Sequence, residues 1–240
     1  MSSTAENGSS SKEHEISKPT TFHLSEIPVS RTRALPAQAS ALAIGAFATT
    51  LTTLSLSLME WRGVTVVNAY VGNFFFISTF GLLITAQWEL AAGNGFAYTV
   101  FSAFALFYAG YGAILTPSFG IAAAYGDDSA QFNNALGFFV ILWTVFVLTF
   151  LIASIPTNIV YIAIFVFVFL GFLFVGASHF AAADGNASSS TSLKKTGGVF
   201  CFLAGLIGWY LTTHLLIKDS LYELPLGDTS QYFPKTRKAT

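Results

Sequence analysis

The stretch that decides the fold is Asn158–Phe180, which reads NIVYIAIFVFVFLGFLFVGASHF. It contains no Lys, Arg, Asp or Glu, and water could not solvate so long an apolar run. A helix needs about 20 mostly apolar residues to cross roughly 30 Å of hydrocarbon. Because backbone groups in hydrocarbon must pair within their own segment, this stretch is predicted to be a membrane-spanning helix.

Five further stretches have the same character, so we predict six spans. The other five are Gln38–Leu58, Val66–Trp88, Phe96–Pro117, Phe132–Ile155 and Gly197–Ile217. The period-two alternation that a transmembrane barrel strand needs is absent from them. The sequence therefore predicts an all-α integral membrane protein with six transmembrane helices in a domain at residues 38–217.

The composition of the whole chain also favours a bilayer as its main solvent. Of the 240 residues, 10% are charged, whereas a typical soluble domain is about a quarter charged. The net charge of -1 excludes a nucleic-acid binder that works by neutralising phosphates. The single cysteine, Cys201, cannot form an internal disulfide, and it is predicted to be a small core residue.

Both ends of the chain are predicted to be polar and cytoplasmic. The leader, residues 1–37, has too little apolar surface to fold alone, so we expect it to be disordered. With six spans, the leader and the tail at residues 218–240 share one side, which carries eight of the 11 Lys and Arg residues. Cytoplasmic segments carry the excess of these residues, which predicts that both termini are cytoplasmic.

A small residue recurs at every fourth position from just before the first predicted span into it, at Ala37, Ala41, Gly45, Thr49 and Thr53. Small residues let helix backbones approach closely, which is typical of tight packing in membranes. The alternative is a narrow conduit beside the helix that no bulky side chain closes. The hydroxyls of Thr49, Thr50 and Thr53 are candidate contacts for a solute on such a path.

Phe47, Phe104 and the phenylalanines around residues 165–169 fall well inside their spans. At a rise of about 1.5 Å per residue they lie at comparable depth. They are candidates for an apolar constriction that gates by size and dewetting, and ordinary core packing is the alternative. Ionisable groups are nearly missing from the spans, which disfavours an ion pump with a buried proton relay.

Motifs for catalysis and for cofactor or metal binding are not found in the sequence. There is no Ser-His-Asp set with plausible neighbours, no Gly-rich phosphate loop followed by Lys, and no Cys/His spacing for a metal. The aspartates lie outside the predicted spans, which argues against intramembrane proteolysis. We therefore expect a protein that is not an enzyme and that carries neither a cofactor nor a metal.

Two motifs carry a family resemblance. Residues 87–96 read QWELAAGNGF, and residues 113–121 read AILTPSFGI. They resemble motifs of the acetate uptake transporter (acetate/succinate permease) family of bacteria and fungi, and Trp209-Tyr210 and Leu224-Pro225 are similar to its last helix and exit. The family motif falls here on Trp88, Glu89, Gly93 and Asn94. From the residues alone, Glu89 and Asn94 are expected to cap the short loop and its helix ends.

The resemblance implies a six-helix protomer in a hexameric ring, with a path for acetate or a similar small acid inside each protomer. Carried over by position, the family's hydrophobic constriction falls on Phe47, Phe104 and Val168. The family's Asn-Pro-Ala-Pro-Leu-Gly-Leu signature is replaced here by QASALAI at residues 38–44. Its helix-two glutamine and helix-six asparagine match Leu82 and Leu211. These departures bear on acetate specificity more than on the fold.

The sequence therefore predicts plasma-membrane transport of small monocarboxylates such as acetate, as the protonated acid or with protons, by a homo-oligomer in the lipid bilayer. An uncharged constriction passes a neutral acid more cheaply than an anion, because an unpaired buried carboxylate costs several kcal/mol. Two alternatives stay open. One is export or facilitation of ammonia along the same path, and the other is a non-transporting sensor or scaffold descended from a permease.

Overall fold

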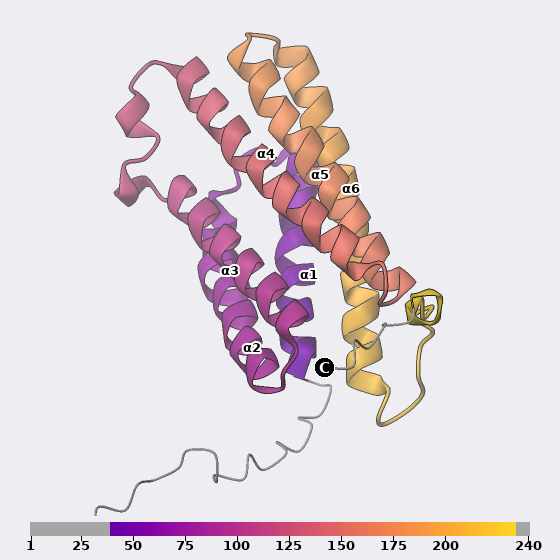
Figure 1. Cartoon of the computed structure of the whole chain (residues 1–240). Helices are drawn as coiled ribbons and strands as arrows, with labels where there is room; N and C mark the ends of the chain where they lie inside the picture. The colour runs from indigo at the N-terminus through magenta and orange to yellow at the C-terminus, as the bar shows by residue number, and fades with distance from the viewer. Residues whose placement is uncertain (1–38, 234–240) are drawn as a thin grey trace, which may run out of the picture. The chain divides into compact units, whose positions relative to one another are not determined.

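The computed structural model describes residues 39–233, and within them six helices are long and apolar enough to cross a membrane (Figure 1). The predicted leader at residues 1–37 lies outside the described residues. They are α1 (Ala39–Leu58), the span Asn68–Ala91 that ends in α2 (Phe80–Ala91), α3 (Gly95–Leu115), α4 (Ser129–Ser154), α5 (Ile159–Ala183) and α6 (Ala187–Ile217). The prediction of an all-α fold with six membrane-length helices is confirmed.

The second span is a composite rather than a regular α-helix. It begins with the 3-10 turn η3 (Asn68–Tyr70), continues through the π-helical segment η4 (Asn73–Thr79) and ends in α2. In a π-helix the bonded carbonyl lies five residues back. The Thr79 hydroxyl donates to such a carbonyl, that of Phe74, at 2.7 Å. The wider turn thus gains a side-chain hydrogen bond in a region where unpaired backbone groups are costly.

Four helices begin directly after an Asn or Asp that caps them. Each capping side chain accepts a hydrogen bond from a backbone N–H three residues later, at distances from 2.9 to 3.2 Å. These caps satisfy N–H groups that have no partner within the helix. The capping residues are Asn94 for α3, Asp128 for α4, Asn158 for α5 and Asn186 for α6.

The helix α6 begins at Ala187, well before the predicted span that starts at Gly197. Hydroxyl groups in its first part bond back to carbonyls four residues earlier. Ser192 donates to Ser188 at 3.0 Å, and Thr196 donates to Ser192 at 2.9 Å. The apolar run that marks a span is therefore only part of this helix, and its polar first part extends beyond the apolar run.

The helix α1 is the central element of the bundle. In its most apolar window 67% of the residues are buried inside the structure, against 28% for α4. It packs against α2 and α6, while α2 packs against α3 and α6 packs against α5. A Cβ atom on Gly198 of α6 would lie only 2.9 Å from the Leu58 Cβ of α1. Small residues thus set the close approach of α1 and α6, as they do in many membrane bundles.

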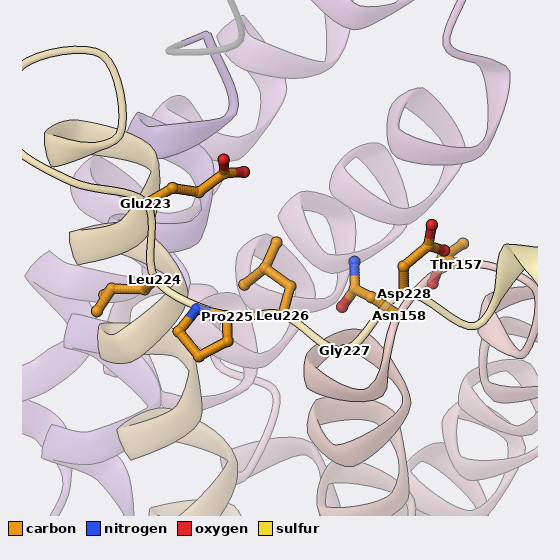
Figure 2. Close-up of a pocket in the computed structure, with 8 residues that line it drawn as sticks. All are labelled: Thr157, Asn158, Glu223, Leu224, Pro225, Leu226, Gly227 and Asp228. Atoms are coloured by element: carbon orange, nitrogen blue, oxygen red, sulfur yellow. The ribbon is translucent and has the colours of Figure 1, made fainter.

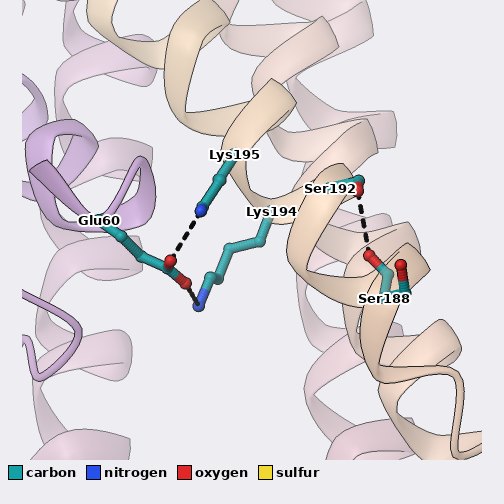
Figure 3. Close-up of polar contacts among 5 residues, drawn as sticks. All are labelled: Glu60, Ser188, Ser192, Lys194 and Lys195. Carbon is teal, nitrogen blue, oxygen red and sulfur yellow. Dashed lines mark hydrogen bonds and ion pairs between the residues drawn. The ribbon is translucent and has the colours of Figure 1, made fainter. Parts of the chain in front are cut away.

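A charged clamp joins the end of α1 to the polar part of α6 (Figure 3). The Glu60 Oε1 atom lies 3.2 Å from Lys194 Nζ, and Glu60 Oε2 lies 2.8 Å from Lys195 Nζ. We call this end of the bundle the far end, and the end that holds the start of α1 and the end of α6 the termini end. The hydrogen bond from Lys195, followed by that from Lys194, lowers the pKa of Glu60.

The clamp makes stability depend on pH. A carboxyl group whose pKa is lowered by folding contributes stability above its unfolded pKa, and that stability is lost as the pH falls through its folded pKa. We expect the contribution of Glu60 to disappear below its ordinary value of 4.5. Unfolding midpoints in detergent, measured from pH 7 downward, test this: Glu60→Gln should weaken the acid dependence, whereas the control Asp127→Asn should leave it intact. Identical acid profiles for Glu60→Gln and wild type would contradict it.

Candidate functional site

Phe47 on α1 and Phe104 on α3 meet inside the bundle. Their ring centroids lie 5.6 Å apart at an interplanar angle of 60°, an edge-to-face arrangement that aromatic pairs favour. Phe104 also lies against Phe150 of α4, with centroids 6.1 Å apart, and Val168 of α5 is fully buried. The structure therefore places Phe47, Phe104 and Val168 in the core, and their role as a constriction stays a prediction.

Two small cavities, each of about 30 Å³, lie inside the bundle. A single water molecule needs about 10–15 Å³ of such space, so each cavity has room for a very small solute. The lining of the first, the termini-side cavity, includes Ile44, Phe47, Leu82, Phe104, Tyr161 and Leu211. The lining of the second, the far-side cavity, includes Leu51, Leu54, Phe107, Tyr108, Phe172 and Cys201.

The order of these residues along the helices shows that the two cavities are stacked. On α1, Phe47 lines the termini-side cavity and Leu51, one turn later, lines the far-side cavity. On α3, Phe104 and Phe107 follow the same order. Val168 lies between the parts of α5 that line the two cavities. The contact of Phe47 with Phe104 therefore lies on the side of the termini-side cavity that faces the far-side cavity.

The three candidate threonines of α1 are absent from the linings of both cavities. The hydroxyl of Thr49 donates to the Gly45 carbonyl and that of Thr53 to the Thr49 carbonyl, each at 2.7 Å. Such bonds are usual for Thr in membrane helices. Thr50 is fully buried, and its hydroxyl has no hydrogen-bond partner within residues 39–233.

The stripe of small residues on α1 lines a groove on the outside of the bundle. Ala41, Gly45 and Thr49 lie in this groove, which has a volume of about 810 Å³ and also involves η4, α2 and the end of α6. Phe76 and Phe80 flank it and are 72% and 52% exposed. A conduit along this face would need a neighbouring molecule to close it.

At the termini end, the carboxylate of Glu89 joins three helices. Glu89 is buried, and it accepts hydrogen bonds from the Ser40 hydroxyl of α1 and, at 2.8 Å, from the Asn94 side-chain amide. Asn94 also caps α3, and Gly93 supplies the turn between α2 and α3 with φ at +80°. Trp88 is exposed. In the structure Glu89, Gly93 and Asn94 thus hold the loop and its helix ends.

The segment at residues 223–229, of which the sequence analysis named Leu224 and Pro225 only as a family match, packs across the start of α5 (Figure 2). We call it the strap. The Ile159 N–H donates to the Gly227 carbonyl at 2.9 Å, and the Thr229 hydroxyl donates to the Ile155 carbonyl at 2.6 Å. The strap thus pairs with backbone groups at two helix ends that lack intrahelical partners. The signal that could have found it is LPLG at residues 224–227, since a residue before Pro is extended and Gly marks a turn.

Two histidines lie in the spans apart from the cavities. His179 Nδ1 lies 3.3 Å from the Asn133 side-chain oxygen. His214 is buried, and its Nδ1 has no hydrogen-bond partner in the described part of the chain. Across residues 39–233, no three His, Cys, Asp or Glu side chains group in a way that could hold a metal ion. The site is therefore built from apolar side chains rather than from charges.

Six membrane-length helices that enclose two small apolar cavities define a multi-pass membrane protein. The chain belongs to the GPR1/FUN34/yaaH family, whose model matches residues 23–226. The family resemblance predicted from the motif at Trp88 to Asn94 is confirmed.

Several relatives have informative names. The acetate transporter protein patA of Aspergillus clavatus is 48% identical over 200 residues, which cover 83% of this chain and 81% of that protein. The patA protein of Penicillium expansum is 46% identical, with 83% and 80% covered. The ammonia transport outward protein 2 of Saccharomyces cerevisiae is 31% identical, with 70% and 57% covered.

The fold also matches a solved structure, that of the bacterial acetate channel SatP. The TM-score is 0.68 at 22% sequence identity, and the match covers 80% of this chain and 99% of that chain. At this identity the match shows a shared fold.

The close fit of the strap predicts a defined effect of Gly227→Ala. Gly227 has φ at +68°, and a Cβ atom there would lie 2.9 Å from Ile159 Cδ1, so we expect the strap to detach more often. Limited proteolysis in detergent should then cut within residues 218–233 several times faster than in wild type. Gly120→Ala is the matched control, because Gly120 has φ at +67° and a Cβ there meets nothing within 4 Å. Equal cutting of the strap in both variants would contradict the fit.

Proposed function

We propose that this protein carries small monocarboxylic acids such as acetate across the membrane, along a path inside each protomer. The observation that carries the proposal is the pair of stacked apolar cavities, the first of which is lined by Phe47 and Phe104 on the side toward the second. The names of the patA relatives support acetate as the substrate.

The transported form in this proposal is the neutral acid. The cavity linings hold no Lys, Arg, Asp or Glu, so a carboxylate anion would be buried without a partner, at high cost. Phe47, Phe104 and Val168 then act as a gate that opens by side-chain movement and admits solutes by size. Thr49, Thr50 and Thr53 line neither cavity, so a contact of any of them with a solute requires the bundle to open, or, for Thr49, a path along the outer groove.

We further propose a homo-oligomer, a hexamer by resemblance to the family, in the plasma membrane with the termini end in the cytoplasm. The excess of Lys and Arg in the leader and tail supports this orientation. The outer groove on α1 supports an oligomer, because an apolar groove with a floor of small residues suits close helix packing against a neighbour. Catalysis has no part in the proposal.

Uptake of labelled acetate by proteoliposomes at pH 5 and pH 7 tests this function. The neutral fraction of a carboxylic acid with a pKa near 4.3 falls roughly eightyfold between these pH values, so uptake should fall by at least tenfold at equal total acetate. Empty liposomes are the control for passive leak. Uptake above leak of an ammonium salt but not of acetate would favour the ammonia alternative suggested by the yeast relative. Uptake of neither would favour the sensor or scaffold.

The gate is tested by truncating one ring. Phe47→Ala should widen the passage between the cavities and raise butyrate uptake relative to acetate uptake several-fold, because a larger acid gains more from the added space. Phe138→Ala is the matched control, since this phenylalanine of α4 is 61% exposed and lines neither the cavities nor the outer groove. An unchanged butyrate-to-acetate ratio in Phe47→Ala would place the path elsewhere.

A further inference from the structure

We infer that the termini-side cavity selects alkyl monocarboxylic acids over hydroxy acids of the same carbon number, with Leu82 and Leu211 as specificity-determining residues. This inference rests on the proposed transport function and adds the substrate class. It predicts that propionate is carried in preference to lactate, which differs from it by one hydroxyl group on the same three carbons.

The wall of the termini-side cavity is the first observation. Its nine lining side chains come from α1, α2, α3, α5 and α6, and eight of them are hydrocarbon throughout. Tyr161 is the exception, but the surface that it presents to the cavity is apolar like the rest of the wall. A solute in this cavity therefore meets no side-chain donor or acceptor.

Most polar groups near the wall are already in use, which is the second observation, and the buried ones without a partner within residues 39–233, Thr50, Ser102 and His214, are absent from the lining. The Thr85 hydroxyl, one turn after Leu82, donates to the Gly81 carbonyl at 2.8 Å. The Thr212 hydroxyl, next to Leu211, donates to the Gly208 carbonyl at 2.9 Å. The carboxylate of Glu89 accepts from Ser40 and Asn94. Helix backbone groups are likewise paired within their helices.

The position of the two leucines makes them the controlling residues. Leu82 and Leu211 come from α2 and α6, and each is 1% exposed. They line the same cavity as Phe47 and Phe104, so every solute that reaches the proposed gate passes them. A side-chain amide at either position would supply the hydrogen-bonding group that the wall lacks.

The physical basis is the cost of removing a hydroxyl group from water. A neutral carboxylic acid loses the hydration of its carboxyl group in the cavity whether or not it carries a further substituent. The extra hydroxyl of lactate must also be desolvated without a new partner. An apolar pocket discriminates against an added hydroxyl by up to about a hundredfold, so we expect propionate to be preferred by about 10- to 100-fold.

The experiment measures uptake of labelled propionate and lactate by proteoliposomes at pH 5, with each rate divided by the concentration of the neutral acid. Wild type should prefer propionate by at least tenfold. Leu82→Gln and Leu211→Asn should each reduce this ratio at least threefold. Leu82→Met, which keeps the wall apolar, and Leu83→Gln, which places the same amide on an exposed face of α2, should keep the wild-type ratio.

Each outcome bears on the inference separately from the proposed function. A wild-type ratio near one, with acetate carried normally, overturns the selectivity and leaves the transport function standing. A ratio that Leu83→Gln changes as much as Leu82→Gln overturns the assignment to the cavity. If Leu82→Gln does not fold, the propionate-to-lactate uptake ratio of Leu211→Asn and the wild-type ratio of acetate to glycolate uptake test the selectivity instead. Failure of wild type to carry any of these acids overturns the transport function itself.

Discussion

The close approach of α1 and α6 is the constraint on which the rest of the structure depends. Lipid tails provide no hydrophobic force between helices, so helices associate where small residues let their backbones meet. A Cβ atom on Gly208 would lie 3.1 Å from Ala48 Cβ and 3.5 Å from the Phe47 ring. The absence of a side chain at Gly208 thus leaves room for the Phe47 ring, which reaches Phe104. The contact between the two helices and the contact of Phe47 with Phe104 are two results of the same packing.

Much of the fold follows from the sequence, because an apolar run of span length has few alternatives to a helix. The depth of Phe47 and Phe104 follows from the same helical rise. The early start of α6 does not follow from the sequence. Its first part is rich in hydroxyl groups, which any hydropathy scale counts as polar even where they bond to their own helix. The strap is likewise hidden, because its partners, Ile155 and Ile159, are distant in sequence. The four-residue period identified the stripe of small residues at Ala41 and Gly45. Whether this stripe faces the inside or the outside of the bundle depends on where α2 packs, which the period does not show.

The polar groups of the chain serve the structure at the ends of the bundle and leave its middle uncharged. Glu60 joins α1 to α6 at the far end, and Glu89 joins α1 to the turn between α2 and α3 at the termini end. Two of the positions that depart from the family pattern, Leu82 and Leu211, line the same cavity. Their convergence could not be read from the sequence, where they lie on separate helices. An uncharged middle suits a neutral solute.

The most direct test of an interrupted route inside the protomer is the side from which single cysteines react with a small, uncharged thiol reagent that does not cross the lipid bilayer. Ile44→Cys and Leu54→Cys, in a Cys201→Ala background, report on the termini-side and far-side cavities. A route closed at Phe47 and Phe104 predicts that Ile44→Cys reacts from the termini side and Leu54→Cys from the far side. Reaction of both from the same side, or of neither from any side, would contradict such a route.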